Sequence, residues 1–166
     1  MTANSPVTVE RRPLKARILP KVFRALNVPI RNVLALPVPT PMGKRLMLLH
    51  LTGRKTGKHY RQPVSYVRLG PALLITPGGG KWKLNLVPGR AVRIRLRGKD
   101  VLAVPELVRD PAEVEQLLET MCASNPMIKR FVPIPRDAAG HLDPDRLALA
   151  LKHGFAVVRW QLDDVA

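Results

Sequence analysis

Short runs in which apolar and polar residues alternate dominate the middle of the chain. Within residues 91–97, Val92, Ile94 and Leu96 alternate with three arginines, the period of two expected for a half-buried strand with one wet face. Similar runs, separated by glycine and proline, cover residues 45–51, 60–69, 72–76 and 101–108. They predict an antiparallel meander. The row of arginines fits a solvated face and a ligand-contacting face equally well.

The apolar spacing becomes helical after this region. Asp110-Pro111-Ala112-Glu113 has the side-chain acceptor, the proline and the glutamate of a helix start. Asp143-Pro144 begins a second helix, which Gly154 is placed to end, and residues 155–162 close the chain as a strand. We therefore expect an α+β domain whose mostly antiparallel, barrel-like sheet is partly covered by helices.

The N-terminal region has a different pattern. Residues 11–32 predict one or two short basic helices with an apolar stripe, broken at Pro20 and Pro29. Such a helix either packs on the domain or lies on an anionic membrane surface. The prolines of residues 36–42 predict a linker. We accordingly divide the chain into a basic N-terminal segment with its linker, residues 1–42, and a cofactor-binding domain, residues 43–166.

Charge is distributed very unevenly. The net charge is +16, and residues 11–99 contain 21 Lys and Arg but no Asp or Glu. Such a field attracts nucleic acid, anionic lipid or a polyanionic small molecule, and charge alone does not choose among them. No apolar stretch reaches the roughly 20 residues of a membrane span, and no secretory signal is recognisable. The expected location is cytoplasmic, or peripheral to the inner face of the membrane if residues 11–32 bind lipid.

Other classes of site have little support in the sequence. Cys122 is the only cysteine, so no internal disulfide forms, and its place in a predicted helix favours a core position. No metal site is expected. Aromatic residues make up only 4% of the chain, and no nucleic-acid-binding motif is recognisable. Specific nucleic-acid binding is therefore a minor alternative.

The segment from Thr52 to Lys58 joins two predicted strands and carries three cations, two hydroxyls and two glycines. Glycines let backbone N–H groups point inward, and arginine matches the planar fork of a phosphate or carboxylate. This composition indicates an anion-binding turn, although a solvated basic hairpin has the same composition. The glycine spacing is not that of a Walker loop.

A second glycine-rich segment, Thr76-Pro77-Gly78-Gly79-Gly80-Lys81-Trp82, leads into Lys83-Leu84-Asn85-Leu86. Consecutive glycines allow a backbone to approach something flat or charged very closely. Trp82 fits a position beside such a ligand or a position in the core. Asn85 is either a polar anchor or a turn residue.

Two ordered motifs together resemble a known family. The run Leu51-Thr52-Gly53-Arg54-Lys55-Thr56-Gly57, followed by Arg61-Gln62-Pro63-Val64-Ser65-Tyr66-Val67, resembles the opening signature of the deazaflavin-dependent nitroreductase family. The run Trp82-Lys83-Leu84-Asn85-Leu86 is similar to that family's Trp-x-x-Asn-Leu motif. The resemblance covers residues 46–96, whereas the N-terminal helices and the C-terminal third agree only in outline.

This resemblance implies a split β-barrel, similar to that of flavin-mononucleotide-binding oxidoreductases, with flanking helices. The implied cofactor is coenzyme F420, a deazaflavin whose tail carries a phosphodiester and several glutamates, with FMN as the alternative. By the same resemblance, the phosphate end is held by Arg54, Lys55, Thr56 and Lys58, with Arg61 adjacent. The ring system is flanked by Pro63, Val64, Ser65 and Gly78, Gly79, Gly80 and Lys81, and supported by Trp82 and Asn85.

The implied activity is hydride transfer to a flat, electron-poor acceptor such as a quinone or a nitro compound. The proton that follows the hydride comes from Tyr66, Ser65 or solvent, with His50 and His59 as further candidates. The C-terminal part lacks the tyrosines that shape the pocket of nitroimidazole-reducing members, which leaves the acceptor open. Alternatives are a non-catalytic barrel that binds flavin, heme or lipid, and a basic nucleic-acid-binding protein. A monomer and a homodimer are both compatible with the sequence.

Overall fold

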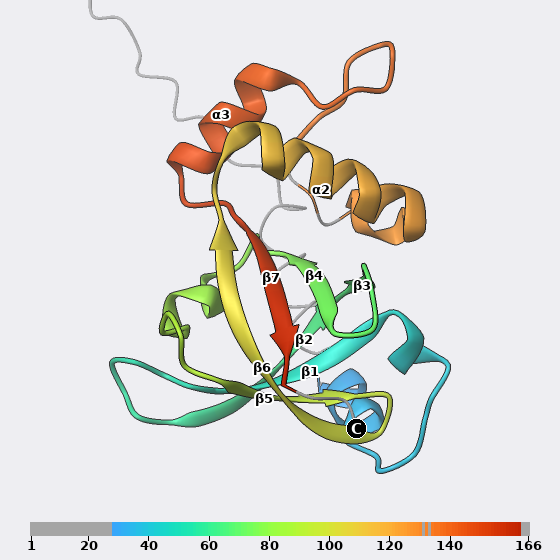
Figure 1. The fold of residues 1–166 in the computed structure, drawn as a ribbon, viewed down its shortest axis with the longest axis vertical. Helices are drawn as coiled ribbons and strands as arrows, with labels where there is room; N and C mark the ends of the chain where they lie inside the picture. The colour runs from blue at the N-terminus through green and yellow to red at the C-terminus, as the bar shows by residue number, and fades with distance from the viewer. Residues whose placement is uncertain (1–27, 131, 133, 164–166) are drawn as a thin grey trace, which may run out of the picture.

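A computed structural model describes residues 28–130, 132 and 134–163 of the chain. Within these residues, seven strands and two complete helices follow one another in the order β1, β2, β3, β4, β5, β6, α2, α3, β7 (Figure 1). The strands are β1 (Leu46–Thr52), β2 (His59–Ser65), β3 (Val67–Arg68), β4 (Leu73–Pro77), β5 (Val92–Leu96), β6 (Lys99–Val108) and β7 (Val157–Leu162). The helices are α2 (Pro111–Ser124) and α3 (Pro144–Lys152), with short 3-10 turns at Met42–Lys44, Lys81–Asn85 and Pro126–Arg130. This is the expected α+β split barrel.

The sheet curls because one stretch of chain serves both of its edges. The strand order is β2-β1-β5-β6-β7-β4-β3, and every neighbouring pair is antiparallel. β2 and β3 are separated only by Tyr66, so the chain leaves β1 at one edge and pairs with β4 at the other. The predicted strands are confirmed, except that the run at residues 60–69 is divided at Tyr66 into β2 and β3. The predicted meander is wrong. The order of strands depends on long-range pairing, which alternation within a strand does not encode.

The barrel interior is one apolar core. Met47, Leu49 and Leu51 of β1 point into it, and Trp160 of β7 lies near its centre with no exposed surface. The ring of Trp160 stacks on Trp82 at a centroid distance of 6.3 Å, and its Nε1 donates to Thr76 Oγ1 over 3.0 Å. The only polar atom of the indole is therefore satisfied inside the core, as burial of a tryptophan requires.

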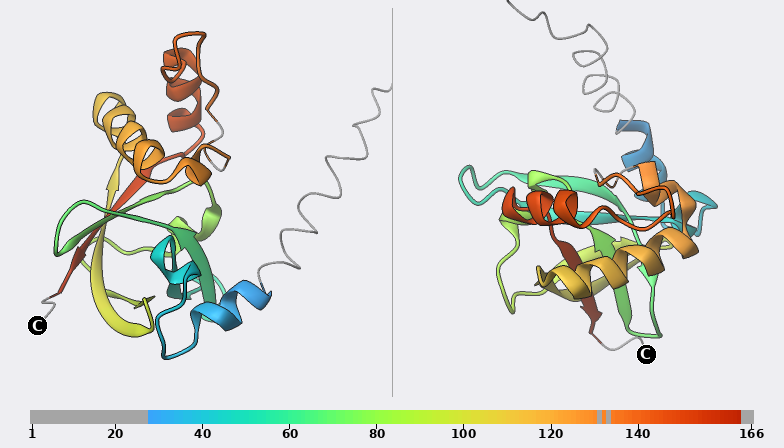
Figure 2. Two further views of the ribbon diagram at one scale, coloured as in Figure 1. Left: turned by 90° about the vertical axis from the view of Figure 1, so that its right-hand side faces the viewer. Right: turned by 90° about the horizontal axis from the view of Figure 1, so that it is seen from above.

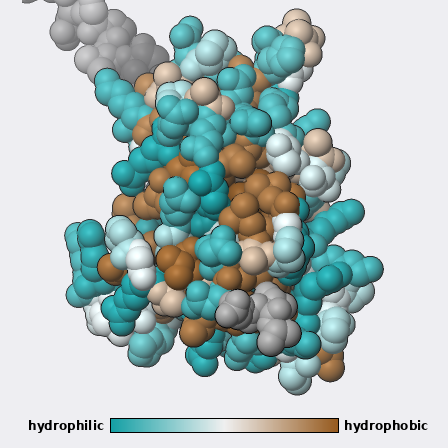
Figure 3. Space-filling view, viewed as in Figure 1, coloured by the Kyte–Doolittle hydropathy of each residue, from teal (hydrophilic) through white to brown (hydrophobic). Residues whose placement is uncertain are grey.

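A second apolar core lies between the outside of the sheet and the helices. Residues of β4 and β7 that face outward, Ile75 and Val157, pack in one cluster with Leu118 and Met121 of α2 and Leu147 of α3. Figure 2 shows both helices gathered at one end of the barrel. On the face that Figure 3 shows, apolar residues gather in the middle, while the rim is mostly polar. Cys122 is buried in this second core, as predicted.

Both predicted helix starts are confirmed. The Asp110 side chain accepts from Glu113 N, and the Asp143 side chain accepts from the amides of Asp145 and Arg146. Glu113 does not complete a capping box, because its carboxylate pairs with Arg159 of β7. Arg159 also binds Glu106 at 2.9 Å, so this arginine ties the first turn of α2 to two strands. Gly154, at φ +87°, ends α3 as expected.

The N-terminal segment packs against the barrel over part of its length. Residues 28–34 are helical, including Pro29, at which a break was predicted, and Leu34 is buried. Most of the predicted basic helical region, residues 11–27, lies outside the described residues. The proline-rich stretch then passes the β5–β6 turn so closely that a Cβ on Gly98 would lie 2.6 Å from the carbonyl carbon of Val38.

Gly98→Ala is expected to destabilise the fold far more than Gly57→Ala. Both glycines have positive φ, +85° and +65°, so each alanine meets a backbone cost of about 1–2 kcal/mol. Only at Gly98 does the added methyl group also collide with backbone, that of Val38, whereas nothing lies within 4 Å at Gly57. Urea denaturation of the two variants measures the difference. Equal losses of unfolding free energy in the two variants would show that the proline-rich stretch does not pack tightly against the β5–β6 turn.

Candidate functional site

The turn between β1 and β2 is closed by backbone hydrogen bonds at both glycines. Gly53 N donates to Lys58 O over 2.9 Å, and Gly57 N donates to Gly53 O over 2.7 Å. Gly57 adopts φ +65°, which favours glycine, and a Cβ on Gly53 would lie 2.7 Å from Thr56 Oγ1. The side chains between them are exposed. The sequence thus builds a fixed loop that presents Arg54, Lys55, Thr56 and Lys58 to solvent.

Asn85 joins the two sequence motifs. Its Oδ1 accepts from Arg54 N over 2.8 Å, and its Nδ2 donates to the Tyr60 hydroxyl over 2.6 Å. The 3-10 turn Lys81–Asn85 places it there, 31 residues beyond Arg54 in the chain. Asn85 is thus a polar anchor, but what it anchors is the turn. We assign it a positioning role, because its Oδ1 and Nδ2 are both engaged by the protein.

Two of the three glycines of the second motif, Gly78 and Gly80, are required by the chain's own packing. A Cβ on Gly78 would lie 2.5 Å from Ala156 O, and one on Gly80 would lie 2.7 Å from the Trp82 ring. Trp82 is buried in the barrel core, behind the surface rather than on it. Gly79, Gly80 and Lys81 are exposed, and β4, which leads into them, contacts β2. The loop therefore lies at the rim of the barrel close to β2.

The predicted site residues of β2, and Tyr66 that follows it, are divided between the two faces of the sheet. Val64 and Tyr66 belong to the barrel core. Arg61, Pro63 and Ser65 pair with His50, Leu48 and Leu46 of β1 and share their outward face. These side chains therefore do not all face one ligand. The backbone of β2 lies at an edge of the sheet.

Tyr66 is held by the protein. Its hydroxyl donates to Gly43 O over 2.9 Å, and burial raises the pKa of the phenol above its usual range. A phenol with a raised pKa and an engaged proton is a poor general acid in this arrangement. Sequence reasoning could not detect this hydrogen bond, because Gly43 lies 23 residues away.

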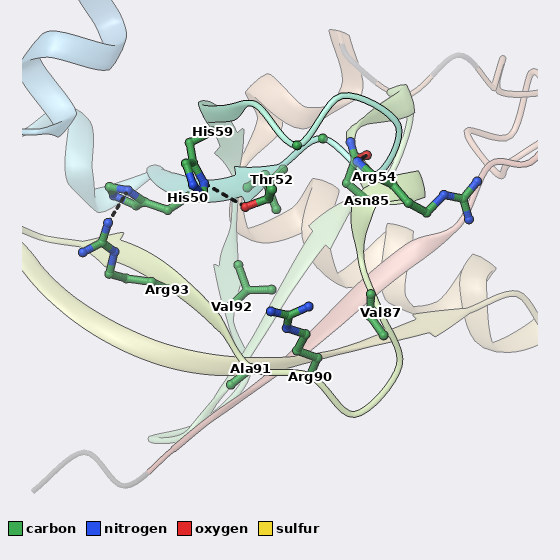
Figure 4. A pocket seen from close by; sticks show the side chains of 13 residues that line it. His50, Thr52, Arg54, His59, Asn85, Val87, Arg90, Ala91, Val92 and Arg93 are labelled. Carbon is green, nitrogen blue, oxygen red and sulfur yellow. Dashed lines mark hydrogen bonds between the residues drawn. The ribbon is translucent and has the colours of Figure 1, made fainter.

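A pocket of about 520 Å³ opens beside the turn (Figure 4). β1 and β5 pair at Leu48–Arg95 and Leu49–Ile94, and the pocket lies beyond this point, where no further pairs join them. In the part of the chain that the structure describes, its lining contains no Asp or Glu but three arginines and two histidines: Arg54, Arg90, Arg93, His50 and His59. Asn85, Val87 and Val92 line it as well, and the His59 Nδ1 lies 2.9 Å from the Thr52 hydroxyl. The pocket is a cationic recess suited to an anion.

The structure brings together only part of the predicted site. Arg54 and Asn85 line the pocket, whereas Pro63, Val64 and the glycines of the second motif do not. Arg90 was not singled out by sequence reasoning, because a lone arginine after Pro88-Gly89 carries no motif signal. Lys83 was missed too: it is buried, its Nζ donates to Gly80 O over 2.8 Å, and burial, assisted by Arg109, lowers its pKa. The signal that could have drawn attention to Lys83 is its place in the motif, between the apolar residues Trp82 and Leu84.

Two other classes of site receive no support from the part of the chain that the structure describes. No group of three or more His, Cys, Asp or Glu in it is arranged to hold a metal ion. None of its helices combines the length and apolar character needed to cross a bilayer.

The chain also matches a known protein family. A family model described as F420H(2)-dependent quinone reductase matches residues 17–131, well over half of the chain. The match includes the turn, the glycine-rich loop and the pocket. No curated protein sequence matches the chain.

Proposed function

Because the chain belongs to the F420H2-dependent quinone reductase family, we propose that it binds the deazaflavin coenzyme at the β1–β2 turn and reduces a quinone. The observation that carries this proposal is the cationic recess beside a turn fixed by Asn85. None of the described residues that line the recess carries a carboxylate, and a phosphodiester with attached glutamates is strongly anionic. The residues present therefore fit the group.

The turn residues are proposed to hold the phosphate end. Arg54, Lys55 and Lys58 supply positive charge, and Thr56 supplies a hydroxyl. Arg61 follows Tyr60 in β2, and its side chain is on the outward face of the sheet. Arginine in particular presents two parallel donors to a phosphate. When bound, the coenzyme supplies the hydride. The protein supplies position and positive potential, which favour binding of the reduced, anionic coenzyme.

The ring system is proposed to lie at the barrel rim, between the Pro63–Val64 backbone and the loop of Gly78, Gly79, Gly80 and Lys81. The contact between β2 and β4 brings these two segments to the same side of the barrel. Trp82 supports the loop from behind, through its ring against Gly80. We propose that Ser65 or solvent, rather than Tyr66, donates the proton that accompanies the hydride. The Tyr66 hydroxyl is already engaged, because it donates to Gly43 O.

Titration of the purified protein with oxidised F420, and separately with FMN, tests the cofactor. We expect fluorescence to report micromolar or tighter binding of F420 at moderate salt and weaker binding of FMN. Oxidation of F420H2 by a short-chain naphthoquinone, followed by absorbance, then tests the reaction, with a nitroaromatic compound as the second acceptor. Binding of FMN alone, or of neither cofactor, would favour a flavin, heme or lipid carrier.

We also propose that the N-terminal segment touches an anionic membrane surface. Several large apolar side chains between residues 28 and 38 are exposed, including Val28 at 55%, Leu36 at 46% and Val38 at 53%. Lys44 and Arg45, a few residues further along the chain, are exposed as well. Exposed apolar side chains beside cations are typical of peripheral attachment to anionic lipid.

The variant Leu36→Glu/Val38→Glu is expected to lower the affinity for anionic vesicles by about tenfold or more, since apolar contact is lost and two negative charges are added. Vesicle co-sedimentation measures it. Met127→Glu/Leu149→Glu is the matched control, because it changes charge equally at two exposed apolar positions near the helices. Equal loss in both variants would indicate general electrostatic attraction, and no loss in the first would remove the proposed contact.

A further inference from the structure

A second basic pocket adjoins the first on the outside of the barrel. Its volume is about 580 Å³, and it shares His50, Leu51, His59 and Arg93 with the pocket beside the turn. Arg31, from the helical residues 28–34, and Arg61 of β2 complete its cationic lining, which again includes no Asp or Glu among the residues that the structure describes. The two pockets therefore form one cationic trough, from Arg54 at the turn to Arg31 at the N-terminal helix.

Two buried hydrogen-bond donors in this second pocket are left without partners. The Arg93 guanidinium lies 3.3 Å from His50 Nδ1. Since a guanidinium only donates, His50 Nδ1 accepts and the imidazole proton is on Nε2. His50 Nε2 and Arg31 Nε are both buried, and neither has a hydrogen-bond partner among the described residues. Buried donors of this kind are costly unless an acceptor reaches them.

The charges around His50 all come from neighbouring elements. Arg93 and Arg95 face it from β5, Arg61 from β2 and Arg31 from the N-terminal helix, with His59 beside it and Asp100 on β6 as the one acidic group among the described residues. Asp100 is itself paired with Arg95 at 3.2 Å. Burial first, and then Arg93, lowers the pKa of His50 below its usual value. The imidazole is thus neutral near pH 7 while the pocket holds no anion.

We infer that Arg31, His50, Arg61 and Arg93 form a second oxyanion subsite, which binds a carboxylate or phosphate group and takes up a proton on His50 as it does so. The bound group has two possible sources. One is the glutamate tail of the coenzyme, and for this source the inference rests on the proposed function. The other source is a lipid phosphate, since the subsite includes the N-terminal helix. An oxyanion would accept from both unpartnered donors and draw Arg93 away from His50 Nδ1, which frees that nitrogen for protonation.

The first test uses the anion alone and does not depend on F420. The chain has four histidines, and His50 is followed by NMR during pH titration with and without γ-linked tri-glutamate. We expect the tri-glutamate to raise the pKa of His50 by about one unit and to bind about fivefold more tightly at pH 5.5 than at 7.5. The sign follows because the free site favours neutral His50 and the anion favours its protonated form.

Matched controls separate the subsite from general attraction to a basic protein. His141 should not respond to tri-glutamate, and neutral tri-glutamine should shift neither histidine. Arg31→Gln/Arg93→Gln should abolish the His50 response, whereas Lys129→Gln/Lys152→Gln, with the same change in net charge, should preserve it. His50→Asn should remove the pH dependence of binding. A His50 resonance that ignores millimolar tri-glutamate in the natural chain, or equal effects in both double variants, would overturn the inference.

A second experiment distinguishes the two sources. If the tail occupies the subsite, Arg31→Gln/Arg93→Gln should weaken binding of F420 with a long glutamate tail by about tenfold and leave binding of the form without glutamates unchanged. If a lipid phosphate occupies it, the same variant should lose anionic vesicles and bind both coenzyme forms as before. Failure of the natural chain to bind F420, together with a His50 response to tri-glutamate, would reject the proposed function and keep the subsite.

Discussion

Simultaneous replacement of Arg54 and Lys55 by alanine is expected to weaken F420 binding by about 100-fold. Each charged side chain that donates to a phosphate contributes about 1.5–3 kcal/mol, and the lower value applies here because both residues are exposed. Fluorescence titration at low and moderate salt measures the change. The loss should be smaller at higher ionic strength, since salt already screens exposed charges.

The control for this variant is Arg146→Ala/Lys152→Ala in α3, which removes the same charge far from the turn in the sequence. Asn85→Asp provides a second comparison, because it keeps an acceptor for Arg54 N and removes the donor to Tyr60. Asn85→Asp adds a negative charge beside the turn. We therefore expect this variant to keep its fold and to bind F420 more weakly. Unchanged affinity in the Arg54/Lys55 variant would place the phosphate end elsewhere.

Trp160→Ala is expected to cost about 3–5 kcal/mol of unfolding free energy, the range for removing a fully buried large aromatic residue. The side chain has no exposed surface, stacks on Trp82 and satisfies Thr76 Oγ1 through its Nε1. For a domain with total stability of about 5–15 kcal/mol, such a loss leaves little margin. Equilibrium denaturation in urea, followed by far-UV circular dichroism, measures it.

Trp160→Phe is the companion variant, since it keeps an aromatic ring in the core but leaves Thr76 without its donor. We expect it to lose less than the alanine variant and to retain cooperative unfolding. Because Trp82 lies between Trp160 and the glycine-rich loop, the phenylalanine variant should also bind F420 more weakly if that loop supports the ring. A loss below about 1 kcal/mol for Trp160→Ala would contradict the packing described here.

The site was only partly accessible to sequence reasoning. The composition of the turn indicated an anion site, and the structure places Arg54 in a cationic pocket. From the sequence, Asn85 fits either a polar anchor or a turn residue. Its hydrogen bond with Arg54 N shows that it anchors the turn. The glycines of the second motif were interpreted as space for a ligand, yet Gly78 and Gly80 leave space for Ala156 and Trp82. A glycine in a sequence signals close approach, but it does not say to what.

The local elements of this protein were determined by its sequence. Alternating runs predicted the strands, and Asp110 and Asp143 predicted both helix starts, because these signals act over a few residues. The tertiary structure alone decided the strand order, the two separate cores and the meeting of Arg31, His50, Arg61 and Arg93 in one pocket. Those features join residues tens of positions apart, and which of them meet depends on how the curled sheet closes and on what packs against its outer face.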